Sequence, residues 1–390
     1  MQPHAAKQLM VGATVLGHLF GAGSVGAQAK RDNTGSARAA TIAVTTAPTL
    51  VIGGNEADES TTFYAIVGAT RLPDGRILIG DRGEFNLRVF SAAGKQLQCF
   101  GRKGSGPGEM VYLAALNRCG DTIYALDIEN GHRVSVFSID LHYKREFRFA
   151  APVVGGPPYR SSCNSAQRFL QYGWEDHRHM KAGVFRTNVP FWYAGASQQS
   201  GVSFAEFPGS ERWGTVAGGQ VSGTRPLPFG KEAIVAIGSR HGYIGTGETY
   251  EIMVFDLAGK RVGTIRDLVT PSPVTPADIK AQINLDVANQ NESQRKRYTA
   301  DFMSMKLPVT LPAYNAFRVD AMDLLWVQDY PQALSKTVRW SVFTPDGKVV
   351  GRVMLPRTLD VFEIGNDYIL GRFMDAEFAV PQVHVYRLTR

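Results

Sequence analysis

The chain has 390 residues, of which 44% are hydrophobic and 20% charged, and it contains 41 glycines and 20 prolines. This composition excludes a largely disordered chain, and the length allows two ordinary domains or one large all-β barrel or propeller. The formal net charge is +7, but the basic residues are spread along the sequence, so no nucleic-acid-binding surface is indicated.

The N-terminus has the pattern of a secretory signal peptide. Residues 1–8 contain one lysine and no acidic residue, residues 9–25 are apolar and small, and Ala27-Gln28-Ala29 supplies a cleavage site. A buried helix or a membrane anchor is the alternative, although a spanning helix needs about 20 apolar residues.

We therefore expect a signal peptide at 1–29, a flexible segment at 30–40 and a folded domain at 41–390. No later segment is apolar enough to cross a bilayer. The mature protein is expected to be exported, either to a periplasm or to the medium.

One sequence pattern recurs along the rest of the chain. It predicts a turn, a short strand, a polar loop, a strand of alternating apolar and polar residues, and a glycine turn. Such period-two apolar runs, bounded by Asp-Gly or Ala-Gly, are typical of strands joined by hairpins. Each copy has an aromatic residue at the equivalent place, and these residues are Phe90, Phe137, Phe255, Phe343 and Tyr386. Successive members of this set are 47, 118, 88 and 43 residues apart, and one propeller blade takes about 40–50 residues.

The interval of 118 residues is expected to hide one degenerate blade. Its strands are predicted at 167–173, 184–194 and 202–207, with 160–164 leading in. If the interval held two blades, the propeller would have seven.

The interval of 88 residues contains an insertion at about 271–306. Thr275 followed by Pro276 is a typical helix start, and Ile279 and Ile283 follow at helical spacing. We expect one or two helices over 276–305, between blades 4 and 5.

The two ends of the domain predict how the ring closes. The final copy reaches only its third strand, at 383–388, while 41–52 is a strand-like run without a partner. We therefore expect the N-terminal strand to complete the last blade, which leaves only short protected edges. The predicted fold is an all-β, six-bladed β-propeller.

Several segments resemble the NHL-repeat-like group of exported bacterial six-bladed propellers. They are the Gly-Lys turns after Val-Phe, the glycine-rich linker at 101–109, and the run at 311–320 that leads into 325–327. The resemblance implies an architecture and not a reaction, because the wider group contains binding scaffolds, sugar-lactone hydrolases and lyases.

The three cysteines are Cys99, Cys119 and Cys163. Cys119 and Cys163 occupy similar places in adjacent blades, which makes them the candidate disulfide pair in an oxidising compartment. Buried unpaired thiols are the alternative.

Two recurring patterns have structural interpretations. Gly104, Gly106 and Gly108 are followed by further strand, so they indicate a linker between blades and not a dinucleotide site. Asp81 with Arg88, and Asp127 with Arg133, recur at equivalent places. Each aspartate is expected to cap a turn and to pair with its arginine.

A metal site is one hypothesis for the degenerate blade. In a strand, His177 and His179 would share one face, next to Glu175, and they could bind zinc or calcium. A solvated polar loop is the alternative. Asp360, Asn117 and Glu232 are candidate oxygen ligands for a cation in the central channel. No other cofactor is predicted, and no catalytic residue is assigned.

A second group of polar and aromatic residues falls in or near the loops that join the second and third strands. Those loops should share one face, where stacking and charged groups could bind a ligand. The candidate ligand-binding residues are Arg82, Glu84, Glu129, Trp174, Glu175 and Tyr330.

These features favour an exported binding propeller that presents this face, with the 276–305 helices beside or over it, to a small molecule, a glycan or a protein. A metal-dependent hydrolase or lyase of the lactonase type is the first alternative. An architectural subunit of a surface assembly, which would show a large exposed apolar patch, is the second.

Overall fold

The computed structural model describes residues 42–54, 58–129, 131–149, 160–173, 180–195, 203–288, 290–375 and 380–390. The predicted signal peptide at 1–29 and the flexible segment at 30–40 lie outside the described residues. No helix in the described part of the chain has the length and apolar character needed to span a membrane.

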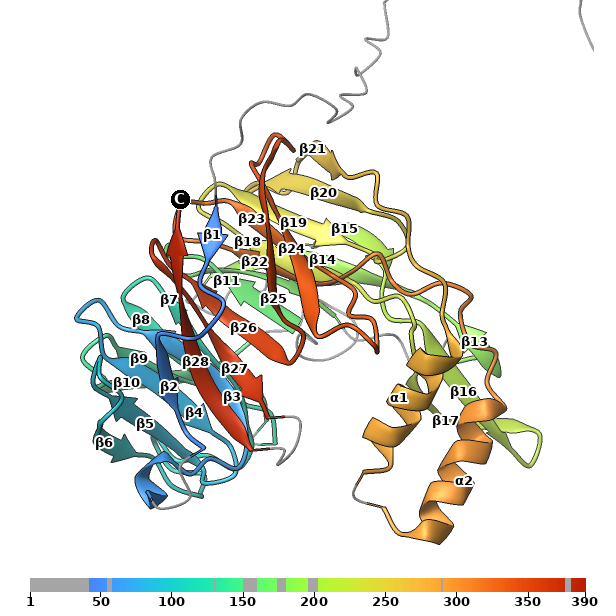
Figure 1. Ribbon diagram of the computed structural model, residues 1–390, viewed down its shortest axis with the longest axis horizontal. Coiled ribbons are helices and arrows are strands. Elements are labelled where there is room, and N and C mark those ends of the chain that lie inside the picture. Colours follow the sequence, from blue (N-terminus) through green and yellow to red (C-terminus); the bar gives the residue numbers. More distant parts are fainter. Residues whose placement is uncertain are drawn as a thin grey trace, which may run out of the picture. The chain divides into compact units, whose positions relative to one another are not determined.

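Six antiparallel sheets form the blades of the propeller (Figure 1). Blade 1 contains β3 (Ile66–Arg71), β4 (Ile77–Asp81), β5 (Asn86–Phe90) and β6 (Gln96–Phe100), and blade 2 contains β7 (Leu113–Cys119), β8 (Thr122–Asp127), β9 (Arg133–Ser138) and β10 (Tyr143–Arg148). Blade 3 contains β11 (Arg160–Cys163), β12 (Arg168–Tyr172), β14 (Asn188–Gly195) and β15 (Ser203–Pro208), and blade 4 contains β18 (Ile234–Ile237), β19 (His241–Gly245), β20 (Glu251–Asp256) and β21 (Arg261–Arg266). Blade 5 contains β22 (Tyr314–Val319), β23 (Leu325–Asp329), β24 (Thr337–Phe343) and β25 (Val349–Pro356), and blade 6 contains β26 (Leu359–Ile364), β27 (Tyr368–Met374) and β28 (Pro381–Thr389).

Blade 6 is closed by the N-terminal part of the domain, as the sequence predicted. β1 (Ala43–Val44) and β2 (Leu50–Ile52) both pair antiparallel with β28 and supply its outer partner. A short 3₁₀ helix, Glu59–Thr61, follows before blade 1.

The six innermost strands are β3, β7, β11, β18, β22 and β26, and each contacts the next around the ring. The contact between β26 and β3 closes the circle, so the prediction of six blades is confirmed. The interval of 118 residues holds blade 3 and a further sheet in place of a seventh blade. That sheet contains β13 (Gly183–Phe185), β16 (Arg212–Ala217) and β17 (Gln220–Pro226), and it does not pair with any blade in the described part of the chain.

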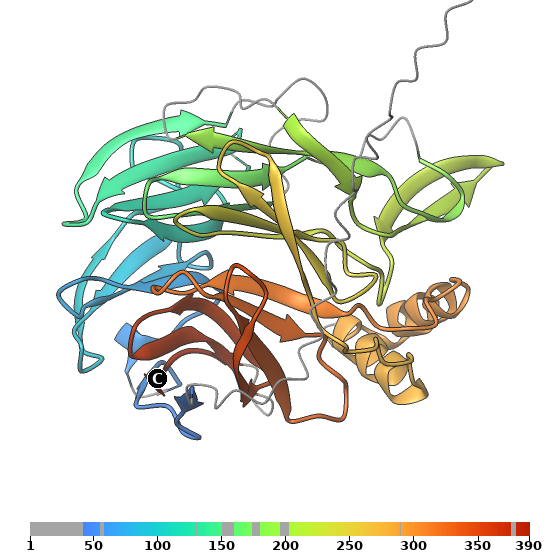
Figure 2. The ribbon, with the colours of Figure 1, turned by 90° about the horizontal axis from the view of Figure 1, so that it is seen from above.

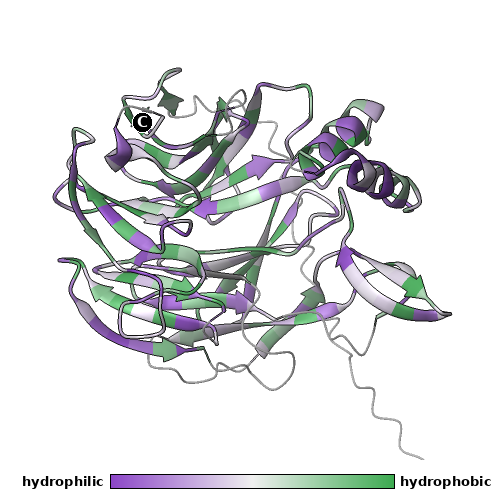
Figure 3. Cartoon of the chain, turned by 90° about the horizontal axis from the view of Figure 1, so that it is seen from below, coloured by the Kyte–Doolittle hydropathy of each residue, from purple (hydrophilic) through white to green (hydrophobic). Residues whose placement is uncertain are grey.

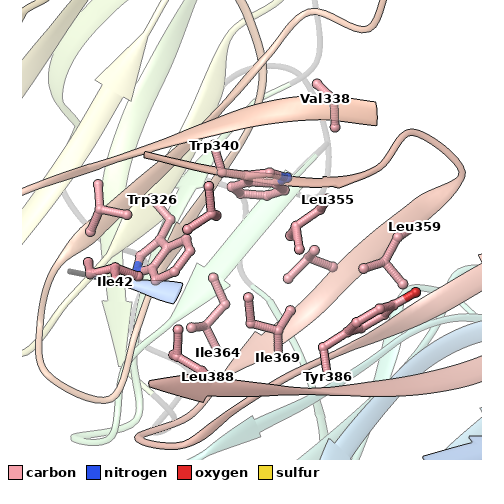
Figure 4. Close-up of a cluster of buried hydrophobic side chains, with 13 residues drawn as sticks. Ile42, Trp326, Val338, Trp340, Leu355, Leu359, Ile364, Ile369, Tyr386 and Leu388 are labelled. Atoms are coloured by element: carbon pink, nitrogen blue, oxygen red, sulfur yellow. The ribbon is translucent and has the colours of Figure 1, made fainter. Parts of the chain in front are cut away.

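The hydrophobic core lies between adjacent blades. In Figure 4, Trp326 and Trp340 of blade 5 face Ile364 and Leu388 of blade 6, and all four side chains are buried. Ile42, just before β1, packs into the same cluster. The apolar residues of each blade therefore stabilise the ring through their neighbours on both sides.

The recurring glycine turns have a common backbone cause. Gly94, Gly259 and Gly347 each occupy the hairpin between the third and fourth strands, with φ of 83°, 88° and 87°. Positive φ strains any residue with a Cβ, which explains why the turn in each of these copies contains glycine.

The helical insertion between blades 4 and 5 is also confirmed. α1 (Pro276–Asp286) begins after the capping side chain of Thr275, and α2 (Glu292–Met303) begins after Asn291. Both starts are capping boxes, in which the side chain and the backbone of two residues satisfy each other's hydrogen bonds. In Figure 3 the two helices carry mainly hydrophilic residues, whereas the blade strands are richer in hydrophobic ones.

The glycine-rich segment at 101–109 is a linker between blades 1 and 2. Arg133 donates hydrogen bonds from its buried guanidinium to the carbonyls of Ser105, Gly106 and Glu109, which holds the linker against blade 2. Cys119 and Cys163, at the ends of inner strands β7 and β11, form a disulfide between blades 2 and 3, the pair that the sequence suggested. Cys99 is a free, exposed thiol on β6.

Candidate functional site

The antiparallel strands of each blade define two faces of the propeller. Successive connections alternate between the faces, so the loops between second and third strands lie with the blade-to-blade connections. We call this the capped face, because the β13–β16–β17 sheet and helices α1 and α2 arise from its connections. The prediction that these loops share one face therefore agrees with the topology.

Three connections build what we call the cap, which consists of the β13–β16–β17 sheet and helices α1 and α2. The β12–β14 connection supplies β13, the β15–β18 connection supplies β16 and β17, and the β21–β22 connection supplies the two helices. In Figure 2 the yellow-green hairpin and the orange helices project from the same side of the blades. Leu227 and Phe229, which follow β17, are buried in one cluster with Phe302 of α2 and with Met305. Insertions about 80 residues apart in the sequence thus share one hydrophobic core.

Polar contacts attach the cap to blades 3, 4 and 5. Lys231 is buried, and its ammonium donates hydrogen bonds to the carbonyl and the hydroxyl of Thr310 at the base of the helical insertion. Burial lowers the pKa of Lys231, an effect that Glu211 opposes. Ala333 in the β23–β24 loop donates its N–H to Asp278 of α1 at 2.9 Å.

Arg186 connects the β13–β14 loop to blades 3 and 4. Its guanidinium donates to the carbonyl of Gly209, at 2.8 Å, and to those of Pro208 and Thr246, and it forms an ion pair of 2.8 Å with Glu248. Burial lowers the pKa of Arg186. Sequence reasoning missed Arg186 and Lys231, because isolated basic residues between irregular strands give no spacing signal.

The predicted ligand-binding residues fall in two separate parts of the capped face. Arg82 donates to the Tyr112 hydroxyl at 2.8 Å and stacks over its ring, while Glu84 and Glu129 are exposed. Tyr330 lies instead beside the cap, where burial and the charges of nearby carboxylates raise its pKa to about 12. No contact in the described part of the chain joins Arg82, Glu84 or Glu129 to Tyr330.

The other predicted residues, Trp174, Glu175, His177 and His179, lie outside the described residues. Their ligand-binding and metal-binding roles stay predictions. Elemental analysis of the mature protein, purified without chelator, tests the metal hypothesis. Near-stoichiometric zinc or calcium would support it, and a folded, metal-free protein would contradict it.

Two carboxylates of the inner strand β26, Asp360 and Glu363, are engaged in ion pairs. Asp360 lies between Arg318, at 3.7 Å, and Arg372, at 3.2 Å. Glu363 pairs with Arg118 at 2.6 Å. Within the described residues, no group of three or more His, Cys, Asp or Glu side chains is arranged to hold a metal ion.

One pocket, with a volume of about 50 Å³, lies where blade 5 meets the base of the helical insertion. Its walls come from the β21–β22 connection and from the start of the β23–β24 loop. The lining residues are Val269, Thr270, Pro271, Ser272, Leu311, Pro312, Ala313, Asp329, Tyr330 and Gln332. Tyr330, one of the predicted binding residues, thus lines this pocket.

Comparison with known proteins supports the architecture. Residues 62–184 match the family model described as "6-bladed beta-propeller" (DUF5128), which confirms the predicted resemblance to six-bladed propellers. No curated protein shows significant similarity to the sequence.

Three solved structures illustrate what this chain is similar to. A protein from Bacteroides fragilis, designated an exported protein, is 15% identical, with a TM-score of 0.47 over 90% of this chain and 96% of that one. A DUF4221 family member from Bacteroides vulgatus is 11% identical, with a TM-score of 0.49 over 89% of this chain and 98% of that one. Virginiamycin B lyase from Staphylococcus aureus is 8% identical, with a TM-score of 0.41 over 90% of this chain and 99% of that one. At these identities no activity is transferred to the present chain.

Proposed function

We propose that this chain is an exported binding propeller whose ligand docks on the capped face, beside the cap at blades 4 and 5. The observation that supports the proposal is the cap itself. Insertions that the propeller ring does not need arise from one face and share a hydrophobic core, and the base of the helical insertion borders a pocket.

The cost of building the cap argues for a role beyond stability. Ordering a residue costs about 1–2 kcal/mol of backbone entropy, and α2 returns little of it through burial, since Phe302 is its one fully buried side chain. The blades already close a ring without these segments. Binding sites are commonly carried by such connections, held in place on a rigid scaffold.

Removal of the helical insertion tests this proposal. The two strands at its base are held together by hydrogen bonds from Val274 N to Val309 O (3.0 Å) and from Leu311 N to Ser272 O (2.8 Å). Residues 276–307 can therefore be replaced by a Gly-Asn-Gly turn without moving the ends. Glycan and peptide arrays are then probed with the wild type and with this variant.

The proposal expects a ligand on an array that the shortened variant binds at least tenfold more weakly. The matched control carries Lys95→Ala and Asp346→Ala, in turns on the opposite face, and is expected to bind as the wild type does. Equal binding by the wild type and the shortened variant, with both folded by circular dichroism, would overturn the proposal.

A further inference from the structure

Three blades end their second strand with an aspartate, and the three aspartates hold the same place in the fold. In the strand pairing, Asp81 faces Ile66, Asp127 faces Leu113 and Asp329 faces Tyr314, the first residue of each inner strand. Each aspartate also pairs with an arginine of the third strand; the pairs are Asp81 with Arg88, Asp127 with Arg133 and Asp329 with Arg339.

In blades 1 and 2 the two residues before the inner strand satisfy this carboxylate. Asp81 accepts the N–H groups of Tyr64 (3.2 Å) and Ala65 (2.9 Å). Asp127 likewise accepts those of Val111 (2.7 Å) and Tyr112 (2.9 Å). Both aspartates are almost fully buried.

Blade 5 lacks both donors. The equivalent residues are Pro312, which has no N–H, and Ala313, whose N–H donates to the carbonyl of Gly247 at 2.9 Å. Asp329 keeps Arg339, whose Nη2 lies 2.7 Å from Oδ2. Its Oδ1 is buried and has no hydrogen-bond partner among the described residues, although a buried acceptor without a partner costs about 1–3 kcal/mol.

Asp329 lines the pocket described above, together with Pro312 and Ala313, which stand in place of the two donors. Burial, partly opposed by Arg339, raises the pKa of Asp329. Burial, then the charge of Asp329, raises the pKa of Tyr250. Nε of Arg339 is likewise buried without a hydrogen-bond partner among the described residues. Since no donor of the described chain bonds Oδ1, the pocket offers this carboxylate to a donor from outside the chain.

The charges around the pocket favour a cationic donor. The charge of Asp267 raises the pKa of Asp329, and the charges of Asp278 and Glu232 raise the pKa of Tyr330, so three further carboxylates lie near the pocket without lining it. Asp267 is paired with Arg352 at 3.0 Å, and Asp278 accepts hydrogen bonds from Thr275 and Ala333. Two guanidiniums, Arg339 and Arg352, oppose these carboxylates. This local acidic excess occurs in a chain whose net charge is +7.

We propose that the pocket binds a primary ammonium group, with Asp329 as its carboxylate partner and Tyr330 as an aromatic wall. This inference deepens the proposed binding function and rests on it. A cation gains from a carboxylate and from the face of an aromatic ring alike.

The size of the pocket limits what can enter. A cavity of about 150 Å³ holds benzene, whereas this pocket measures about 50 Å³. Its volume therefore matches an ammonium head with one or two methylene groups better than a sugar ring or a trimethylammonium head. The ligand class is an unbranched alkylamine, either free or at the end of a lysine side chain.

Titration of the ¹⁵N-labelled mature protein with n-butylammonium tests the assignment, with the chemical shifts of backbone amides as the readout. We expect saturable shifts confined to the backbone amides of residues 269, 270, 272, 311, 313, 329, 330 and 332, since the other pocket residues are prolines. n-Butanol has the same shape without the charge, and butyltrimethylammonium has the charge on a head that is too large. Both are expected to give no saturable shift at these residues, and equal binding of either would overturn the proposal.

Asp329→Asn is expected to weaken n-butylammonium binding at least tenfold, while Asp301→Asn, at an exposed acid of the cap, leaves it unchanged. Ser272→Leu keeps the Asp329–Arg339 pair and fills the pocket from its rim, so it supplies the test if Asp329→Asn does not fold. Retained binding in either folded pocket variant would overturn the proposal. Tighter binding of Nα-acetyl-lysine methylamide than of n-butylammonium would assign the ammonium to a lysine side chain, and the reverse order to a free amine.

This experiment and the array experiment can fail independently. A cap-dependent array ligand, combined with no binding of n-butylammonium, would overturn the ammonium assignment and leave the binding function in place. Asp329-dependent binding of n-butylammonium, without any cap-dependent ligand, would support the pocket and contradict the wider proposal.

Discussion

Blades 1 and 5 each end the second strand with an aspartate, Asp81 and Asp329, but the hydrogen-bond partners of the two carboxylates differ. In blade 1, Asp81 accepts three backbone N–H groups, from Tyr64, Ala65 and Gly83, and it pairs with the buried Arg88. In blade 5, Pro312 removes one donor and Gly247 takes the other, so Asp329 borders a pocket. A structural carboxylate thus becomes a candidate binding group through the loss of its backbone partners.

The largest expected effect comes from Asp81→Ala. This change removes the acceptor of three N–H groups and the carboxylate partner of the buried Arg88, whose guanidinium keeps the carbonyls of Ser60 and Thr62. We therefore expect a loss of about 4 kcal/mol in the free energy of unfolding. Urea denaturation of the mature protein measures it. The control is Asp74→Ala, which breaks an exposed pair with Arg76 and should cost less than about 1 kcal/mol. Similar losses for both variants would show that the buried pair does not hold blade 1 together.

Removal of the disulfide between blades 2 and 3 is expected to have the next largest effect. Cys119 and Cys163 are 44 residues apart, and closing a loop of that size stabilises a fold by about 3–4 kcal/mol in the chain-entropy model. The double variant Cys119→Ala/Cys163→Ser should lose that amount in urea denaturation. Cys99→Ser, at the exposed thiol, serves as the control and should unfold as the wild type does. An unchanged midpoint in the double variant would exclude this contribution.

A pH effect is expected from His384 in blade 6. This ring is buried, stacks on Phe373 at 4.3 Å, and lies 2.8 Å from the side-chain oxygen of Gln382 and 3.3 Å from the Tyr386 hydroxyl. Burial lowers its pKa from 6.5 to about 4. The unfolded chain therefore binds the proton first, and stability that is present above pH 6.5 is lost as the pH falls toward 4.

The loss attributed to His384 corresponds to about 3 kcal/mol between these pH values. Unfolding of the wild type and of His384→Gln, measured in parallel from pH 7 to pH 4, isolates it, because the variant lacks the titrating group. His142→Gln, at an exposed ring, should keep the wild-type slope. Parallel pH profiles for the wild type and His384→Gln would refute the assignment.

The smallest expected effect on stability comes from Asp329→Ala, and this variant tests the difference between Asp329 and Asp81 most directly. Because Asp329 has one unsatisfied oxygen, and Arg339 is partly exposed to water, the loss should be about 1 kcal/mol or less. Urea denaturation beside Asp81→Ala provides the measurement. A loss as large as that of Asp81→Ala would mean that Asp329 is a structural group like its counterpart.

The regular blades could be predicted from sequence because their signals are local. Alternation of apolar residues, glycines at positive φ and the Asp81–Arg88 and Asp127–Arg133 spacings all act within one blade. The N-cap Thr275 likewise located α1 within one residue. These features need no knowledge of distant segments.

The candidate site depends on contacts that no local pattern encodes. The hairpin β16–β17 was missed, and its packing against α2 joins segments about 80 residues apart. Tyr330 was predicted as a binding residue, but its neighbour Asp329 was not. A signal was available: Pro312 stands where blades 1 and 2 have residues with an N–H.

Hydrogen exchange measured by mass spectrometry, with and without the glycan or peptide that the arrays identify, tests the central claim most directly. If the capped face at blades 4 and 5 is the binding surface, protection will appear in residues 209–233, 267–313 and 330–336. Protection confined to turns of the opposite face, such as 72–76, 239–240 and 321–324, would contradict it.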